Sequence, residues 1–164
     1  MVKADKRVAV FPGSFDPFTY GHREVVQQGL SLCDEVFVAV GRSGHKGALF
    51  SAAERVDMIK RIFVNEPRVQ VEAFEGLVVK FALEKNAIAL IRGLRTEADF
   101  SYEMPMAMTN RKLFGGIQTI FFPTTADHHY VSSSLVKEVA IHGGDITDFA
   151  PQLVVDMIEE KLAE

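Results

Sequence analysis

The stretch FPGSFDPFTYGH, residues 11–22, carries the residues best suited to chemistry on a phosphate. An apolar run at residues 8–10 precedes it and predicts a short buried strand, and an amphipathic helical pattern begins at its end. A loop between a strand and a helix start directs free backbone N–H groups and the positive end of the helix dipole at one point, where phosphates bind. His22 lies at that point and is placed to donate to a phosphoryl oxygen.

Basic side chains follow two further predicted strands. Lys46 lies in the glycine-flanked loop GRSGHKG, and Arg92 and Arg95 lie in the segment IRGLR. A lysine supplies a compact positive charge, and arginine binds phosphate oxygens through two N–H groups at once. The alternatives are a solvated loop lysine and surface salt bridges from the arginines to Glu97 or Asp99. We favour phosphate binding for the two arginines.

A second cluster of polar residues lies near the C-terminus, where Ser132, Ser133 and Ser134 precede an amphipathic pattern. Serines cap helices, so capping alone is the alternative to a second phosphate site at this helix start. His128 and His129 are adjacent and would point opposite ways on an extended chain, and no other His/Cys cluster accompanies them. We therefore expect no structural zinc site, and any magnesium would arrive bound mostly by substrate phosphates.

The elements that must position these residues alternate along the chain. Short apolar, β-rich runs separated by helical patterns predict a doubly wound, Rossmann-like α/β fold with a parallel five-stranded sheet and helices on both faces. Ser51 and Glu54 form a predicted capping box. We expect a single domain over residues 1–164. The predicted strands lie at residues 8–11, 36–40, 69–71, 87–91 and 117–122, and the helices at 21–33, 51–64, 76–85, 96–114, 132–142 and 151–162.

The unusual residues all follow predicted strands. Residues 14–22 follow the first strand, 41–46 the second, 92–95 the fourth and 124–134 the fifth. Ligands of such folds bind beyond the carboxyl ends of the strands. The sequence therefore predicts one site at that edge of the sheet.

Composition narrows the functional class. The chain has 164 residues, a formal net charge of −4 and a pI of about 5.7, which argue against generic nucleic-acid binding. Its single cysteine, Cys33, falls on an apolar helix face and predicts a buried thiol in a reducing compartment. The apolar runs have the length of strands, so we expect no membrane span and a cytoplasmic enzyme.

The motif Thr19-Tyr20-Gly21-His22, with the preceding PGSF, resembles the signature of the nucleotidyltransferase superfamily. Together with ERV, LIRGLR, ADFSYEM, NRKL, VSSSLVKEVA and GGDIT, it makes nearly the whole chain similar to the phosphopantetheine adenylyltransferase family. The resemblance implies transfer of AMP from ATP to 4′-phosphopantetheine, giving dephospho-coenzyme A and pyrophosphate without a covalent intermediate. It also implies use of Mg²⁺, a homohexamer and feedback inhibition by coenzyme A.

The resemblance further implies roles for individual residues. His22 would stabilise the transition state, assisted by Lys46 and Arg95. The acceptor would be bound by Ser14, Lys46, Val78 and Arg92. ATP would be bound by Ser14, Phe15, His22, Gly93, Leu94, Arg95, Glu103, His128, His129, Tyr130, Val131, Ser132, Ser133 and Ser134.

Three residues depart from the family pattern, namely Gly47, Pro105 and His128, and none of them removes an implied chemical role. Pro105 lies inside a helical pattern and is expected to kink or break it. The nearby methionines, Met104, Met106 and Met108, are expected to pack in the core or at an interface.

Other functions are compatible with parts of the sequence. A related adenylyltransferase could use another acceptor, such as nicotinamide mononucleotide or a cytidylyl acceptor. A non-catalytic sensor of coenzyme A or a nucleotide could have kept the fold, although His22 and Lys46 are both present. A Rossmann dehydrogenase is disfavoured because the GxGxxG fingerprint is missing.

Overall fold

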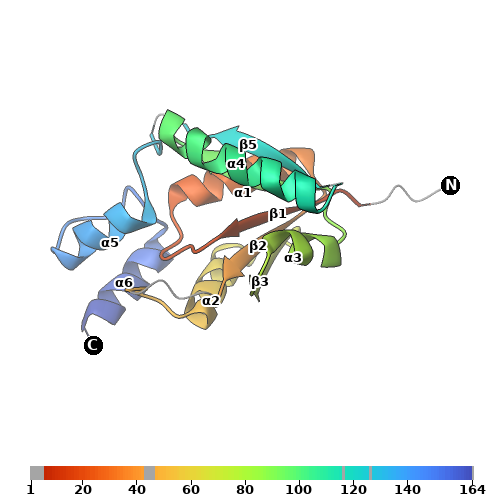
Figure 1. Cartoon of the computed structure of the whole chain (residues 1–164). Helices are drawn as coiled ribbons and strands as arrows, with labels where there is room; N and C mark the ends of the chain where they lie inside the picture. Colours follow the sequence, from red (N-terminus) through yellow and green to blue (C-terminus); the bar gives the residue numbers. More distant parts are fainter. Residues whose placement is uncertain (1–5, 43–46, 116, 126, 164) are drawn as a thin grey trace.

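Strands and helices alternate along the chain in the computed structural model, which describes residues 6–42, 47–115, 117–125 and 127–163 (Figure 1). Every predicted strand and helix is present. The elements are β1 (Val8–Gly13), α1 (Tyr20–Leu32), β2 (Glu35–Gly41), α2 (Ala52–Ile62), β3 (Val69–Phe74), α3 (Val78–Glu84), β4 (Ala89–Leu94), α4 (Glu97–Leu113), β5 (Gln118–Pro123), α5 (Ser133–Ile141) and α6 (Gln152–Ala163).

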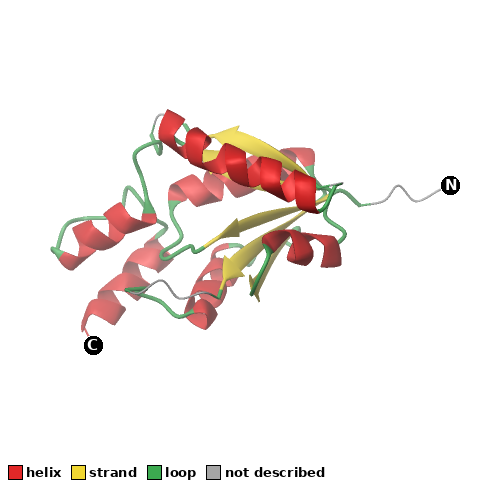
Figure 2. Ribbon diagram, in the orientation of Figure 1, coloured by secondary structure: helices red, strands yellow, loops and turns green. Residues whose placement is uncertain are grey.

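The five strands form one parallel sheet in the order β3-β2-β1-β4-β5. The chain starts in the middle, builds outward through β2 and β3, and then crosses to the other side of β1. Helices α1 and α2 pack on one face, and α3 and α4 pack on the other (Figure 2). This confirms the doubly wound, Rossmann-like fold. The reversal of strand order between β1 and β4 is where such folds bind ligands.

The central strand β1 is buried on both faces. Ala9 and Phe11 belong to the core cluster that includes α1 and α2, whereas Val8 and Val10 belong to the cluster on the α3 face. Alternate residues of a strand point to opposite faces, so this division is what a doubly covered strand requires. The burial fixes the carboxyl end of β1, from which the loop to His22 departs.

Side-chain caps define where several helices start. Ser51 and Glu54 form the predicted capping box on α2, and Thr19 and His22 form another on α1. Ser132 caps α5 by accepting a hydrogen bond from the Leu135 N–H at 3.1 Å. The capping function expected of the serine cluster is thus confirmed for its first member.

Helix α4 corrects one expectation and agrees with another. The helix continues through Pro105, and because proline has no N–H, the helical hydrogen bond to the Ser101 carbonyl is lost there. None of its described residues is buried, so the methionines do not pack in the core of the protomer. Met106 and Met108 are 51% and 66% exposed.

Helix α1 approaches the sheet closely at Gly29. A Cβ atom there would lie 2.7 Å from Cδ1 of Ile91 and 3.2 Å from a methyl carbon of Val36. Both neighbours are fully buried, so the contact can be relieved only by moving the helix or by an unfavourable rotamer. We expect Gly29→Ala to lower the free energy of unfolding by about 1–3 kcal/mol in urea titrations. Ser31→Ala, on the exposed side of α1, is a suitable control for this variant. Gly47→Ala is not, because Gly47 has a positive φ that alanine seldom adopts.

Candidate active site

Two adjoining cavities lie at the carboxyl ends of β1 and β4. The first has a volume of about 270 Å³ and the second about 330 Å³. Both are lined by the end of β1 and by an ion pair between β4 and α4. The shared lining residues are Pro12, Gly13, Ser14, Arg92 and Glu103. A ligand in one cavity would therefore meet a ligand in the other at this wall.

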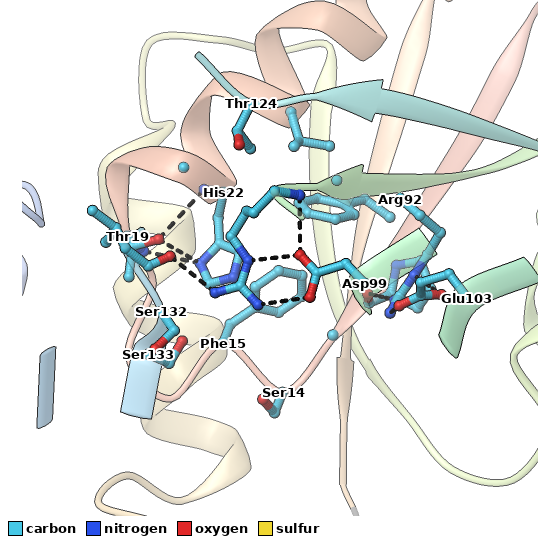
Figure 3. A pocket seen from close by; sticks show the side chains of 18 residues that line it. Ser14, Phe15, Thr19, His22, Arg92, Asp99, Glu103, Thr124, Ser132 and Ser133 are labelled. Carbon is cyan, nitrogen blue, oxygen red and sulfur yellow. Dashed lines mark hydrogen bonds and ion pairs between the residues drawn. The ribbon is translucent and has the colours of Figure 1, made fainter. Parts of the chain in front are cut away.

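The first cavity collects polar side chains from segments that are distant in the sequence. They come from the loop after β1, from the start of α1, from β4 and α4, and from the residues before α5 (Figure 3). The residues predicted for the site that line it are Ser14, Phe15, His22, Arg92, Gly93, Arg95, Glu103, Val131, Ser132 and Ser133. The structure therefore brings most of the predicted residues together around one cavity at this sheet edge.

His22 is held in one orientation by the helix that it caps. Its Nδ1 atom accepts a hydrogen bond from the backbone N–H of Thr19 at 3.0 Å, and the rings of Phe15 and Phe18 flank it at centroid distances of 5.0 and 5.4 Å. Burial and, to a smaller extent, the charges of Arg95 and Arg92 lower the pKa of His22 to about 3. The ring is neutral near pH 7, and because Nδ1 accepts, its proton lies on Nε2.

This geometry predicts a single tautomer of His22 over a wide range of pH. We expect its ring nitrogen resonances to report a protonated Nε2 and an unprotonated Nδ1 from pH 8 down to pH 5, because the low pKa keeps the ring neutral throughout. Nitrogen-15 NMR of histidine-labelled protein measures this directly. Exposed His142 is the internal reference, and a titration of His22 near pH 6.5 would contradict the assignment.

The arginines of the IRGLR segment line the first cavity but are also paired with carboxylates. Arg92 forms an ion pair with Glu103 and donates to the Pro12 carbonyl at 2.6 Å. Arg95 pairs with Asp99, as the alternative sequence interpretation suggested. Burial would raise the pKa of Asp99, but hydrogen bonds from Arg95 more than offset this effect and lower it. The pairing holds both guanidinium groups at the cavity rather than removing them from it.

The second cavity has a mainly apolar lining. Phe74, Val78, Leu90 and Met106 line it, and Asn110 on α4 adds an amide group. Val78 was predicted to contact the acceptor, and it lies here rather than in the first cavity. The α4 residues that line the cavity share one helix face, since they are spaced by about one turn. These lining residues of α4 are Tyr102, Glu103, Met106, Ala107 and Asn110.

Asp16 fastens the loop after β1 to two other parts of the site. Its carboxylate accepts hydrogen bonds from the backbone N–H groups of Leu49 and Phe50 at 3.0 and 2.9 Å. It also forms an ion pair with Lys137 on α5 at 2.8 Å. Asp16 is 6% exposed. One carboxylate therefore ties the β1 loop, the segment before α2 and helix α5 together.

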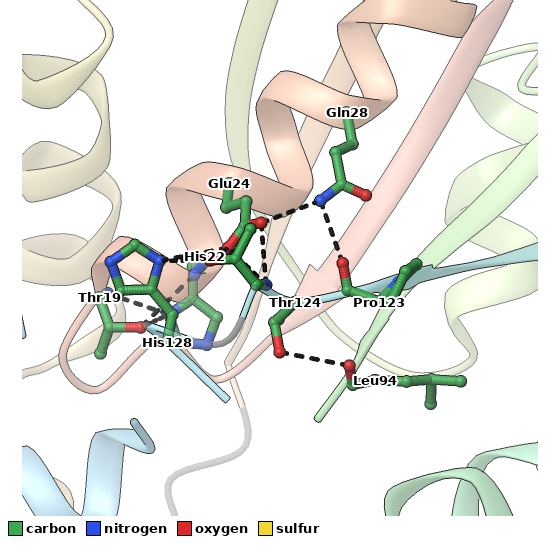
Figure 4. Close-up of polar contacts among 9 residues, drawn as sticks. Thr19, His22, Glu24, Gln28, Leu94, Pro123, Thr124 and His128 are labelled. Carbon is green, nitrogen blue, oxygen red and sulfur yellow. Dashed lines mark hydrogen bonds and ion pairs between the residues drawn. The ribbon is translucent and has the colours of Figure 1, made fainter. Parts of the chain in front are cut away.

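Glu24 fastens the segment after β5 to helix α1. Its carboxylate accepts from the Thr125 N–H at 3.0 Å and lies 3.2 Å from Nδ1 of His128 (Figure 4). Gln28 adds a hydrogen bond to the Pro123 carbonyl at 3.1 Å. These contacts place the residues that precede Ser132 beside the helix start that carries His22.

Several predicted residues lie elsewhere. Lys46 falls outside the described residues. Among the predicted ATP-binding residues, those that do not line either cavity are Leu94, His128, His129, Tyr130 and Ser134. Sequence reasoning did not assign Glu24 or Asp99 to the site, and it included Asp16 and Thr124 only within the ranges predicted to lie at this sheet edge. Asp99 was considered only as a salt-bridge partner. Asp99, Glu103 and Met106 are spaced by about one helical turn, and this spacing could have placed all three on the cavity face of α4.

Comparison with known proteins shows the family of this chain. A family described as cytidylyltransferase-like matches residues 10–139. The phosphopantetheine adenylyltransferase of Geobacter metallireducens is 44% identical over 97% of this chain and 98% of its own. That of Caldanaerobacter subterraneus is 45% identical over 94% and 97%. The chain belongs to the phosphopantetheine adenylyltransferase family. The resemblance found in the sequence motifs is therefore confirmed.

Solved structures support the fold of this adenylyltransferase family member. A putative nicotinate-nucleotide adenylyltransferase from Vibrio parahaemolyticus superposes with a TM-score of 0.70 at 19% identity, over 96% of this chain and 94% of its own. The nicotinic acid mononucleotide adenylyltransferase of Plasmodium falciparum, complexed with NaAD, gives a TM-score of 0.67 at 18% identity, over 94% and 95%. At these identities the likeness establishes a shared fold.

Two further properties concern the described part of the chain. Within residues 6–42, 47–115, 117–125 and 127–163, no helix combines the length and apolar character needed to cross a bilayer. Over the same ranges, no three His, Cys, Asp or Glu side chains are grouped as metal ligands would be. The carboxylates of the first cavity, Asp99 and Glu103, are each engaged by an arginine. Because both carboxylates are already paired with arginines, the first cavity suits a polyanion better than a bare metal cation.

Proposed function

We propose that the protein transfers the adenylyl group of ATP to 4′-phosphopantetheine and releases pyrophosphate. The observation that carries this proposal is the wall shared by the two cavities. ATP would occupy the first cavity, with its phosphates near His22. The apolar second cavity would take the pantetheine arm along Phe74, Val78 and Met106, and the acceptor phosphate would lie at the wall beside Arg92.

The reaction would proceed by direct attack. An oxygen of the acceptor phosphate forms a bond to the α-phosphorus of ATP as the bond from that phosphorus to the β-bridging oxygen breaks, and pyrophosphate leaves with the bonding electrons. The nucleophile is already an anion, so no general base is required. The protein's task is to align two polyanions and stabilise the charge of the transition state.

The described side chains are suited to that task. The Nε2–H of neutral His22 would donate to a nonbridging oxygen of the α-phosphate. Arg92 and Arg95 would offset charge from the side of β4, and the start of α5 would add its dipole. Lys46 remains a predicted partner of the acceptor phosphate.

Magnesium would enter with ATP. Over the described residues no three metal-ligating side chains are grouped, so the ion would be held mainly by the phosphates of ATP. The metal would supply charge neutralisation on the phosphates, while positioning would rest with the protein.

Coenzyme A would bind as an inhibitor because it contains the same pantetheine arm and adenylate, and could therefore span both cavities. A homohexamer would bury the apolar surface of α4, where Phe100, Tyr102, Met106, Met108 and Leu113 are 41% to 73% exposed. Sedimentation would measure the oligomeric state. The substrates and the lone buried Cys33 are compatible with the cytoplasm.

The deciding experiment measures pyrophosphate release with ATP and Mg²⁺. We expect release only when 4′-phosphopantetheine is added, and dephospho-coenzyme A should form in equal amount. Nicotinamide mononucleotide and nicotinic acid mononucleotide serve as control acceptors. Release with a control acceptor alone would keep the chemistry and overturn the acceptor. Binding of ATP or coenzyme A without release under any condition would favour a sensor.

A further inference from the structure

Arg55 is a buried cation that the proposed reaction does not yet use. It belongs to the ERV motif on α2 and is 3% exposed. Within the described ranges its hydrogen bonds go to backbone carbonyls rather than to a carboxylate. Nε donates to Phe50 and Ser51 at 3.1 and 3.3 Å, and Nη1 donates to Ser14 and Gly41 at 2.5 and 3.2 Å.

Two of the four carbonyls belong to residues that line the cavities. Ser14 lines both cavities, and Gly41, at the end of β2, lines the second. Phe50 and Ser51 stand at the start of α2, and the Phe50 N–H is held by Asp16. One guanidinium therefore joins the end of β1, the end of β2 and the start of α2.

The bond to Ser14 also fixes the direction of a peptide unit. The N–H and C=O of a trans peptide point in opposite directions, so the Phe15 N–H points away from Arg55 when the Ser14 carbonyl points toward it. Phe15 has a φ of 51°, in the left-handed region that non-glycine residues seldom adopt. Such a conformation persists only where surrounding contacts impose it, and the Arg55 bond is one of them.

We propose that Arg55 is a positioning residue that turns the Phe15 N–H toward the phosphates of the nucleotide in the first cavity. It acts through the backbone and does not touch the ligand. Its carbonyl partners leave the positive charge uncompensated, so the same side chain raises the potential behind the loop in which polyanions would bind.

This role requires the planar guanidinium group, whose N–H donors have fixed relative directions. The guanidinium reaches partners through Nε and Nη1 at fixed angles, whereas a lysine ammonium is a single point on a flexible stem. Arg55→Lys keeps the charge and loses the planar group, which makes it the informative variant. Arg61→Lys is the matched control because Arg61 lies on the same helix, is exposed, and pairs only with nearby Asp57 among the described carboxylates.

The test compares ligands with and without phosphates, and it rests on the proposed function only in taking ATP as the nucleotide. Calorimetry would measure the affinities of ATP and adenosine for wild type, Arg55→Lys and Arg61→Lys at a temperature where circular dichroism shows all three folded. We expect Arg55→Lys to weaken ATP binding by about tenfold or more and adenosine binding by less than about twofold. Equal losses for both ligands would reduce Arg55 to a general structural role and overturn the proposal.

A measurement on the wild type covers the case in which Arg55→Lys does not fold. Inorganic tripolyphosphate should shift the amide resonance of Phe15 in a saturable way, and an unmoved resonance at saturation would overturn the proposal. Turnover with 4′-phosphopantetheine is scored separately on the wild type. A failure of that assay would reject the acceptor while leaving the Arg55 result readable.

Discussion

Replacing His22 by alanine is expected to lower kcat by about a hundredfold or more while ATP affinity changes little. The ring donates from Nε2 in a fixed direction, and its partner in the proposed reaction gains charge as the transition state forms. An interaction of this kind strengthens between ground state and transition state, so its loss falls on kcat rather than on binding. Steady-state pyrophosphate release and ATP calorimetry measure the two quantities.

Alanine also removes the His22 half of the capping box on α1 and the ring that lies beside Phe15 and Phe18, so a control must separate stability from chemistry. His22→Gln does so because glutamine three residues after a threonine N-cap preserves a capping box, with its side-chain oxygen accepting from Thr19. We expect His22→Gln to unfold close to wild type and, because the NH₂ group of glutamine can still donate, to retain more of kcat than His22→Ala. A His22→Ala enzyme that is folded and has nearly normal turnover would refute the donor role.

Asp16→Asn is expected to destabilise the protein by about 3–5 kcal/mol, the largest stability change that we predict. The amide cannot offset the charge of Lys137, and its NH₂ group would face a donor where the carboxylate now accepts. The loop with Ser14 and Phe15 would lose its attachment to the start of α2. Urea unfolding at a fixed protomer concentration measures the change.

Asp34→Asn provides the contrast. Asp34 pairs with Arg7 at 2.9 Å, but their side chains are 44% and 59% exposed. Solvent weakens such a pair, so we expect a much smaller loss of stability than for Asp16→Asn. Similar losses for both variants would mean that burial does not govern the strength of these ion pairs, and that Asp16 is not the anchor that we describe.

The sequence predicted the sheet and its helices because the strands are short apolar runs separated by periodic patterns. It also placed the β1 loop and the IRGLR segment at one edge, since the carboxyl ends of parallel strands share an edge. The loss of one hydrogen bond at Pro105 is compatible with a helix that continues to Leu113.

The groups that hold the site together could not be predicted from the sequence. Asp16 and Arg55 were inside quoted motifs, but apart from the ion pair of Asp16 with Lys137 the partners named above are backbone atoms, such as those of Leu49, Gly41 and Ser14, which carry no side-chain signal. Contacts of this kind depend on loop paths. The second cavity was missed for a related reason, because Met106 and its neighbours were assigned to packing when only the fold shows that α4 faces an opening.

The capping box on α1 has a consequence for the entropy of catalysis. A side chain that must be immobilised for each turnover subtracts roughly 0.5–1.5 kcal/mol from the useful interaction free energy. The imidazole of His22 is immobilised when α1 forms, because the Thr19 N–H already holds it. Its rotational freedom is lost during folding, so none remains to be lost when substrates arrive.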